Sequence, residues 1–161
     1  MSLEQKVGQL FVPYVSGATA ETTSAENIAR FGVPTPAEAV ATFHLGGVIY
    51  FVWSGNVESP QQIAALSNGL QRAGSDAGNR VPLSIAIDQE TGPGSRIGPP
   101  ATMFPGAMAL GAARDPQLTK SAYAITGQEL RAVGINTDYA PDADVNVNPA
   151  NPVIHPSGAH F

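Results

Sequence analysis

The stretch Leu83-Ser-Ile-Ala-Ile-Asp-Gln-Glu-Thr-Gly-Pro-Gly-Ser-Arg96 decides the fold of the chain. Its first five residues follow Pro82 as a short apolar run, which is typical of a strand buried on both faces in a parallel sheet. The run ends at Asp88, and the glycines and proline that follow predict a loop that returns to neither strand nor helix. A carboxylate at the carboxyl end of such a strand stands where barrel and doubly wound enzymes hold their sites.

Arg96 follows Asp88 on the far side of this glycine loop, which can fold the guanidinium back toward the carboxylate. An Asp and an Arg that converge at a strand end form a polar clamp suited to sugar hydroxyls. The residues also fit a plainer interpretation, in which Asp88 caps backbone amides of the loop and Arg96 lies in solvent. The pattern alone leaves both interpretations open.

Composition limits the class of protein. The chain has 161 residues, 43% hydrophobic and 13% charged, which predicts a globular domain with its own core. A net charge of −5 without a basic cluster argues against nucleic acid and anionic membranes as partners. The absence of cysteine excludes disulfides, thiol nucleophiles and zinc–thiolate sites. Neither a membrane span nor an export signal is recognisable, so the chain as written is expected in the cytoplasm.

Apolar runs alternate with helical patterns along the chain. Strands are expected at 10–15, 47–52, 83–87 and 135–139, and helices at 2–10, 35–45, 59–73 and 115–133, with 16–33 as a surface loop. This alternation predicts repeated βαβ units and a parallel α/β sheet. Such an open sheet would leave its edges unpaired and Val48, Ile49, Ile85 and Ile87 partly solvated, which predicts self-association.

Two of the four expected strands end in acidic loops. Asp88 and Glu90 follow the third strand, and Asp142 and Asp144 follow the fourth. Parallel strands point the same way, so these carboxylates are expected on one rim. Paired acids suit glycoside hydrolysis, but the same grouping fits a metal or phosphosugar site.

Several blocks of the sequence resemble the N-terminal barrel of glycoside hydrolase family 3. They occur in the family's order over nearly all of residues 2–154. The matching stretches are 3–11, 45–49, 87–90 with Gly92 and Arg96, 104–105, 108–111, 134–136, 140–141, 144–146 and 151–154. Within the family, Asp-Gln-Glu followed by Gly and Arg is similar to the β-N-acetylhexosaminidase branch, whereas the β-glucosidase branch would carry a His-Gly pair after this strand.

The resemblance implies a partial TIM (β/α)8-type barrel, about the first four βα units, from an enzyme that hydrolyses terminal β-linked N-acetylglucosamine with retention and needs no cofactor or metal. Carried over to this sequence, Asp88 would bind sugar hydroxyls and Arg96 would help to hold the same sugar. Glu90 and Asp144 are expected as further rim residues, and Gln89 is expected to shape the loop. Thr91 stands where the family pattern has glycine.

Two alternatives remain beside this interpretation: a β-glucosidase-type family 3 hydrolase, and a half-barrel that binds sugar without catalysis. A domain acting on a phosphorylated metabolite is disfavoured, because no glycine-rich phosphate loop links a strand to a helix. The resemblance also places the Asp nucleophile and the proton-transfer His-Asp pair outside this chain, so no catalytic residue is expected within it.

The end of the chain departs from the family pattern. Residues 1–154 are predicted to be the N-terminal part of the barrel, and 155–161 a tail that a frameshift would explain, because a shifted reading frame restores a family-like continuation. His155 and His160 are therefore not predicted to be a metal pair or catalytic residues.

Overall fold

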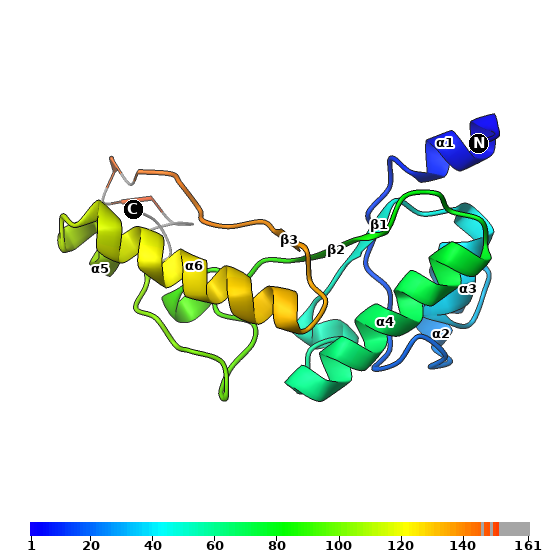
Figure 1. Ribbon diagram of the computed structural model, residues 1–161, viewed down its shortest axis with the longest axis horizontal. Helices are drawn as coiled ribbons and strands as arrows, with labels where there is room; N and C mark the ends of the chain where they lie inside the picture. Colours follow the sequence, from blue (N-terminus) through cyan, green and yellow to red (C-terminus); the bar gives the residue numbers. More distant parts are fainter. Residues whose placement is uncertain (146, 149, 152–161) are drawn as a thin grey trace. The chain divides into compact units, whose positions relative to one another are not determined.

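The computed structural model describes residues 1–145, 147–148 and 150–151 (Figure 1). The chain forms two compact units, Met1–Ile87 with Ala132–Thr137, and Asp88–Arg131 with Asp138–Phe161. The predicted tail at 155–161, including its two histidines, lies outside the described residues. The predicted boundary at residue 154 stays a prediction.

Four α-helices belong to the first unit. They are α1 (Leu3–Gly8), α2 (Ala25–Phe31), α3 (Pro36–Phe43) and α4 (Pro60–Asp76). Ser2 and Thr35 each form a capping box, and the Ser59 side chain accepts from the backbone of α4, so the three predicted helix starts are confirmed. α3 packs against α4 (Figure 1).

A three-stranded sheet has the order β1-β2-β3, with β1 at Gly47–Ile49, β2 at Ser84–Ile87 and β3 at Thr137–Asp138. β1 and β2 are parallel, with Val48 opposite Ile85. Beside β3, the Asn136 amide N–H donates to the Ile85 carbonyl at 3.0 Å, and Asn136 Oδ1 accepts from Ile85 N at 2.9 Å. The predicted parallel α/β arrangement is therefore present.

The first predicted strand, at 10–15, is reduced to one isolated bridge between Tyr14 and Ile49, so the prediction of four strands is wrong for the described residues. The segment still runs beside β1, because the Pro13 carbonyl accepts from Ile49 N at 3.1 Å. Proline has no amide hydrogen to donate, which interrupts the ladder at this point.

Residues 16–33 also differ from the predicted loop, because they contain α2. Ser24 caps this helix at its start, and Gly32 ends it in a left-handed conformation with φ of 73°. Asn27 is fully buried and fixes α2 to the preceding segment: its Oδ1 accepts from Ser16 N at 2.9 Å and its Nδ2 donates to Ser16 O at 2.8 Å. These long-range bonds hold a helix whose sequence lacks an apolar stripe.

The core of the first unit is apolar and closed. Its largest fully buried side chains are Tyr50, Ile63, Leu66, Leu70, Leu83, Ile85, Ile87, Ile135, Val15, Val40 and Val48. The expected solvation of Val48, Ile85 and Ile87 is therefore wrong, and Ile49 is half-buried.

The second unit contains the 3-10 turn η2 (Gly92–Gly94) and helix α5 (Ala107–Ala112), neither of which was predicted. It also contains nearly all of α6 (Pro116–Ala132), which Asp115 caps through bonds from the amides of Gln117 and Leu118. Ala122 and Leu130 of α6 are buried, whereas Leu118 and Ile125 are exposed. No helix in the described part is long and apolar enough to cross a membrane.

Candidate functional site

Asp88 lies half-buried directly after β2, at the position that the sequence predicts. Among the described residues, no hydrogen bond or ion pair engages its carboxylate. A half-buried carboxylate without a protein donor is available to accept hydrogen bonds from a ligand.

The neighbouring Gln89 fixes the loop that carries Asp88. Its side chain is buried, its Oε1 accepts from the backbone N–H groups of Arg96 and Ile97 at 2.8 Å each, and its Nε2 donates to the Ile97 carbonyl at 3.3 Å. Gln89 therefore closes the loop from inside, which confirms that it shapes the loop. The backbone of Arg96 is brought back toward the residue that follows Asp88.

The Arg96 guanidinium lies beside Glu90, with Nη2 3.8 Å from Glu90 Oε1. Both side chains are partly exposed, so this loose ion pair contributes little to stability. The contacts of the described residues include no direct bond between Arg96 and Asp88. The predicted sugar-binding roles of Asp88 and Arg96 stay a prediction.

Electrostatic interactions connect Glu90 to the surrounding acids. Burial is the main cause that raises the pKa of Glu90, and the nearby Asp142 and Asp88 carboxylates add to the rise, while Arg96 opposes it. Asp144 is exposed, and its described hydrogen bond runs from its backbone N–H to Asp142 Oδ1 at 3.0 Å. The structure therefore groups Asp88, Glu90 and Asp142 electrostatically. In the described part of the chain, Asp144 joins them only through its backbone bond to Asp142.

Asp138, at the end of β3, is a further member of this group that the sequence reasoning missed. Its Oδ1 accepts from Gln89 N at 2.9 Å. The pKa of Asp138 is raised to about 6. Burial is the main cause, the bond from Gln89 N opposes the rise, and the neighbouring Asp88 and Glu90 carboxylates add to it. The available signal was an acidic residue near the end of an expected strand, the same signal that identifies Asp88.

Thr91, which replaces the family's glycine, adopts an extended conformation with φ of −83° and ψ of 164°. The left-handed conformation falls on Gly92 instead, with φ of 62°. A Cβ atom there would lie 2.6 Å from the backbone of Gly106, so glycine is required at position 92 and not at 91.

No group of three or more His, Asp or Glu side chains among the described residues is arranged to hold a metal ion. The chemistry that this arrangement offers is that of carboxylates in different environments. Asp88 can accept hydrogen bonds, and Asp138 with its raised pKa can carry a proton near neutral pH.

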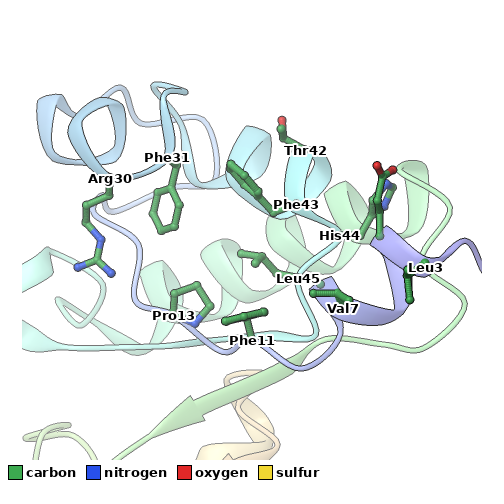
Figure 2. Close-up of a pocket in the computed structure, with 12 residues that line it drawn as sticks. Leu3, Val7, Phe11, Pro13, Arg30, Phe31, Thr42, Phe43, His44 and Leu45 are labelled. Carbon is green, nitrogen blue, oxygen red and sulfur yellow. The ribbon is translucent and has the colours of Figure 1, made fainter.

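A separate groove of about 780 Å³ lies in the first unit (Figure 2). Side chains from α1, α2, α3 and the adjoining segments line it, and most of them are apolar, among them Leu3, Val7, Phe11, Phe31, Phe43 and Leu45. His44 ends α3 in a left-handed conformation with φ of 50°. The groove has no pair of carboxylates and is therefore no alternative acid site.

Parallel strands followed by a carboxylate cluster define a class of α/β enzymes with the site at the carboxyl edge of the sheet. The model described as "Glycosyl hydrolase family 3 N terminal domain" matches residues 2–158, and the chain belongs to this family. The predicted family and its barrel-type α/β fold are thus confirmed.

Three relatives illustrate the likeness. The chain is 44% identical over 127 residues to beta-hexosaminidase A of Pseudoalteromonas piscicida, covering 76% of this chain and 21% of that protein. A family 3 beta-N-acetylglucosaminidase structure from Paenibacillus sp. str. FPU-7 has a TM-score of 0.82 and 43% identity, over 96% of this chain and 26% of that one. A beta-N-acetylhexosaminidase structure from Beutenbergia cavernae DSM 12333 has a TM-score of 0.79 and 32% identity, over 100% of this chain and 46% of that one. The chain thus spans less than half the length of each.

Proposed function

We propose that this chain forms the sugar-binding part of a retaining β-N-acetylhexosaminidase that acts on terminal β-linked N-acetylglucosamine. The observation that carries the proposal is the half-buried Asp88 carboxylate, which follows a parallel strand and has no partner among the described residues. The names of the relatives support the class of substrate.

In this proposal, the Asp88 carboxylate accepts hydrogen bonds from hydroxyl groups of the sugar in the non-reducing subsite. Gln89 and Asp138 hold the backbone next to Asp88, so the carboxylate is already oriented before the sugar arrives. Arg96 donates to the same sugar, and its loose contact with Glu90 leaves N–H groups of the guanidinium for this purpose.

Retaining hydrolysis needs a nucleophile and an acid/base about 5 to 5.5 Å apart across the scissile bond. In this proposal, both come from a part of the protein outside residues 1–161. The 161-residue chain is then expected to bind N-acetylglucosamine without hydrolysing a chromogenic β-N-acetylglucosaminide.

The binding test is a titration of the isotope-labelled chain with N-acetylglucosamine, followed by NMR. We expect amide shifts at residues 88–97 that Asp88→Ala abolishes. Asp76→Ala is the matched control, because Asp76 is exposed on α4. Equal binding by the parent and Asp88→Ala would contradict the proposed role, and a preference for glucose would favour the β-glucosidase alternative.

The catalytic test places this chain in an active context. The aligned segment of the Pseudoalteromonas piscicida beta-hexosaminidase A is replaced by this sequence, and hydrolysis of chromogenic N-acetylglucosaminide and glucoside is compared. A charge-assisted hydrogen bond is worth roughly 1.5–3 kcal/mol, so Asp88→Ala should lower kcat/KM by about tenfold to a hundredfold. Arg96→Ala should act in the same direction with an unchanged melting temperature. A variant that loses stability but keeps its activity per folded molecule would instead indicate that Asp88 only caps the loop.

Self-association is a further part of the proposal. β3 lies at the end of the sheet order and neighbours only β2. One of its edges therefore has no strand partner among the described residues. An unpaired edge offers backbone hydrogen bonds to a second copy of the chain.

A further inference from the structure

Trp53 is the only tryptophan of the sequence, and it lies in the turn that follows β1. Its side chain is 63% exposed. Most large aromatic side chains bury the greater part of their surface, and an exposed one next to other aromatic rings marks an interaction site more often than an isolated exposed residue does.

The turn that carries Trp53 is held rigidly. It forms the 3-10 turn η1 (Val52–Ser54), and Gly55 ends it with φ of 75°. Below it, the buried Ser54 and Asn56 form a polar network: Ser54 Oγ donates to Phe51 O at 2.9 Å, and Asn56 Nδ2 donates to Gly17 O at 2.9 Å. The exposed indole is therefore presented by a fixed support.

Two further aromatic rings surround the indole on its protein side. Phe51 stacks on Trp53 with ring centroids 4.9 Å apart and planes 16° apart, while Tyr14 meets Trp53 edge-on at 4.6 Å. The centroids of Tyr14 and Phe51 are 6.2 Å apart, far less than the sum of these two separations, so the two rings do not cover opposite faces of the indole. In the described part of the chain, no ring or cation is stacked on the face of Trp53 opposite Phe51.

Hydrogen-bonding groups lie at the border of this aromatic cluster. Glu26 accepts from the Tyr14 hydroxyl with one oxygen and from Ser16 Oγ with the other, at 2.9 Å for Ser16. The Arg30 guanidinium carbon lies 3.6 Å from the centroid of the Tyr14 ring. The bonds from Tyr14 and Ser16, and then the charge of Arg30, lower the pKa of Glu26, which is therefore a carboxylate at neutral pH.

We propose that Trp53, with Phe51 behind it and Tyr14 beside it, is a stacking platform for one pyranose ring of a β-linked N-acetylglucosamine oligomer. Equatorial substituents leave the faces of such a ring covered by C–H groups, whose partial positive charge complements the negative face of an indole. Glu26 and Arg30 provide an acceptor and a donor for hydroxyl groups at the ring border. The choice of sugar rests on the proposed function, whereas the platform rests on the ring geometry.

The place of the platform in the fold agrees with this ligand. The turn follows β1, which runs parallel to β2, so Trp53 lies at the edge of this strand pair where both strands end. Loops at the carboxyl edge of parallel sheets carry the ligand-binding residues of α/β enzymes. A ring held here binds a sugar unit of an oligomer independently of the Asp88 carboxylate.

The single tryptophan makes a direct experiment available. The folded chain is titrated with the β-1,4-linked trimer of N-acetylglucosamine, and the Trp53 emission and its quenching by iodide are recorded. We expect a saturable blue shift of the emission and protection from iodide. By NMR titration, Trp53→Ala should bind the trimer roughly tenfold more weakly. Val52→Ala, an exposed apolar residue of the same turn, is the control and should bind as the parent does.

The outcomes separate this inference from the proposed function. Asp88→Ala should keep the Trp53 response, and loss of that response in Asp88→Ala would show that the indole has no site of its own. An unchanged emission and unchanged quenching at a trimer concentration that saturates the NMR shifts would overturn the platform. Protection from iodide that grows with protein concentration in the absence of sugar would assign the exposed face to self-association instead. The emission readout uses the parent protein, so it stands even if Trp53→Ala fails to fold.

Discussion

At the residue scale, the neighbourhood of Asp88 depends on contacts that are far apart in the sequence. Asp138 accepts from the amide of Gln89, 49 positions away, and Gln89 in turn closes the loop to Ile97. The Asp88 carboxylate is left without a partner in the described structure because its neighbours satisfy the loop backbone. The Asp88 carboxylate, which is available to a ligand, is thus positioned by Gln89 and Asp138, whose own side chains bond to the loop backbone.

The raised pKa of Asp138 gives a pH-dependent prediction. The folded protein binds the Asp138 proton more tightly than the unfolded chain does, since the pKa rises from 3.8 to about 6. The stability that this carboxyl contributes is therefore fully present below pH 3.8 and is lost as the pH rises through about 6. Asp138→Asn keeps an acceptor oxygen for Gln89 N and removes the charge, so it should stabilise the protein at pH 7.5.

Thermal unfolding of the parent and Asp138→Asn between pH 4 and pH 8 checks this expectation. The gain is on the order of 1 kcal/mol above pH 7, because the half-exposed site is screened by solvent, and it should shrink toward pH 4. Asp76→Asn controls for the removal of one negative charge from an exposed position. A stability difference that is the same at every pH would contradict the assignment.

Gln89 gives a prediction for the loop itself. Gln89→Ala leaves the amides of Arg96 and Ile97 without their buried acceptor, which should cost roughly 2–3 kcal/mol of unfolding free energy. Amide hydrogen exchange should accelerate more at residues 90–97 than in the rest of the second unit. Gln61→Ala, on the exposed face of α4, is the matched control. Unchanged exchange at Arg96 and Ile97 would show that other contacts hold the loop.

At the element scale, α2 shows how a helix can form where the sequence pattern indicates a loop. Its residues lack an apolar stripe, so tertiary contacts must supply the stability that amphipathic packing usually provides. Asn27 supplies them through bonds to the backbone of Ser16 and Pro34. The same contacts support the segment that carries Tyr14, and therefore one side of the Trp53 platform.

Asn27→Ala should destabilise the chain by about 2–3 kcal/mol, because it removes the side-chain partners of both the buried amide N–H and the carbonyl of Ser16. Chemical denaturation measures the loss. Asn68→Ala on the exposed face of α4 should change stability by less than about 0.5 kcal/mol. Trp53 emission should also shift to the red in Asn27→Ala, and an unchanged spectrum and midpoint would mean that α2 is held in another way.

At the scale of the whole molecule, we propose that self-association uses the edge of β3 that has no strand partner among the described residues. The side chains of Val48, Ile85 and Ile87 are buried and are therefore not the contact surface. We expect the mass measured by light scattering to rise with concentration. Tyr139→Lys places a charge beside the edge and should reduce the association, since charged edge residues oppose strand pairing. Tyr139 is exposed, so the substitution should leave the fold intact. A constant monomer mass at every concentration would exclude association through this edge.

The sequence by itself determined the features that short-range patterns encode. The caps at Ser2, Thr35 and Ser59, the buried strand at 84–87 and the carboxylate that follows it are all visible from the spacing and type of neighbouring residues. The family motifs are likewise contiguous blocks, which is why the sequence was sufficient to predict the family and the parallel α/β class.

Only the tertiary structure decided the features that depend on residues meeting across long separations. The helix at Ala25–Phe31 forms where a loop was predicted, because Asn27 bonds to segments outside the helix. The predicted strand at 10–15 keeps one bridge, which joins Tyr14 to the distant Ile49. The site further depends on Asp138, which reaches Gln89 only when β3 takes its place in the sheet. The physical reason is that burial and hydrogen-bond partners are set by the packing of distant segments, and local periodicity carries no record of that packing.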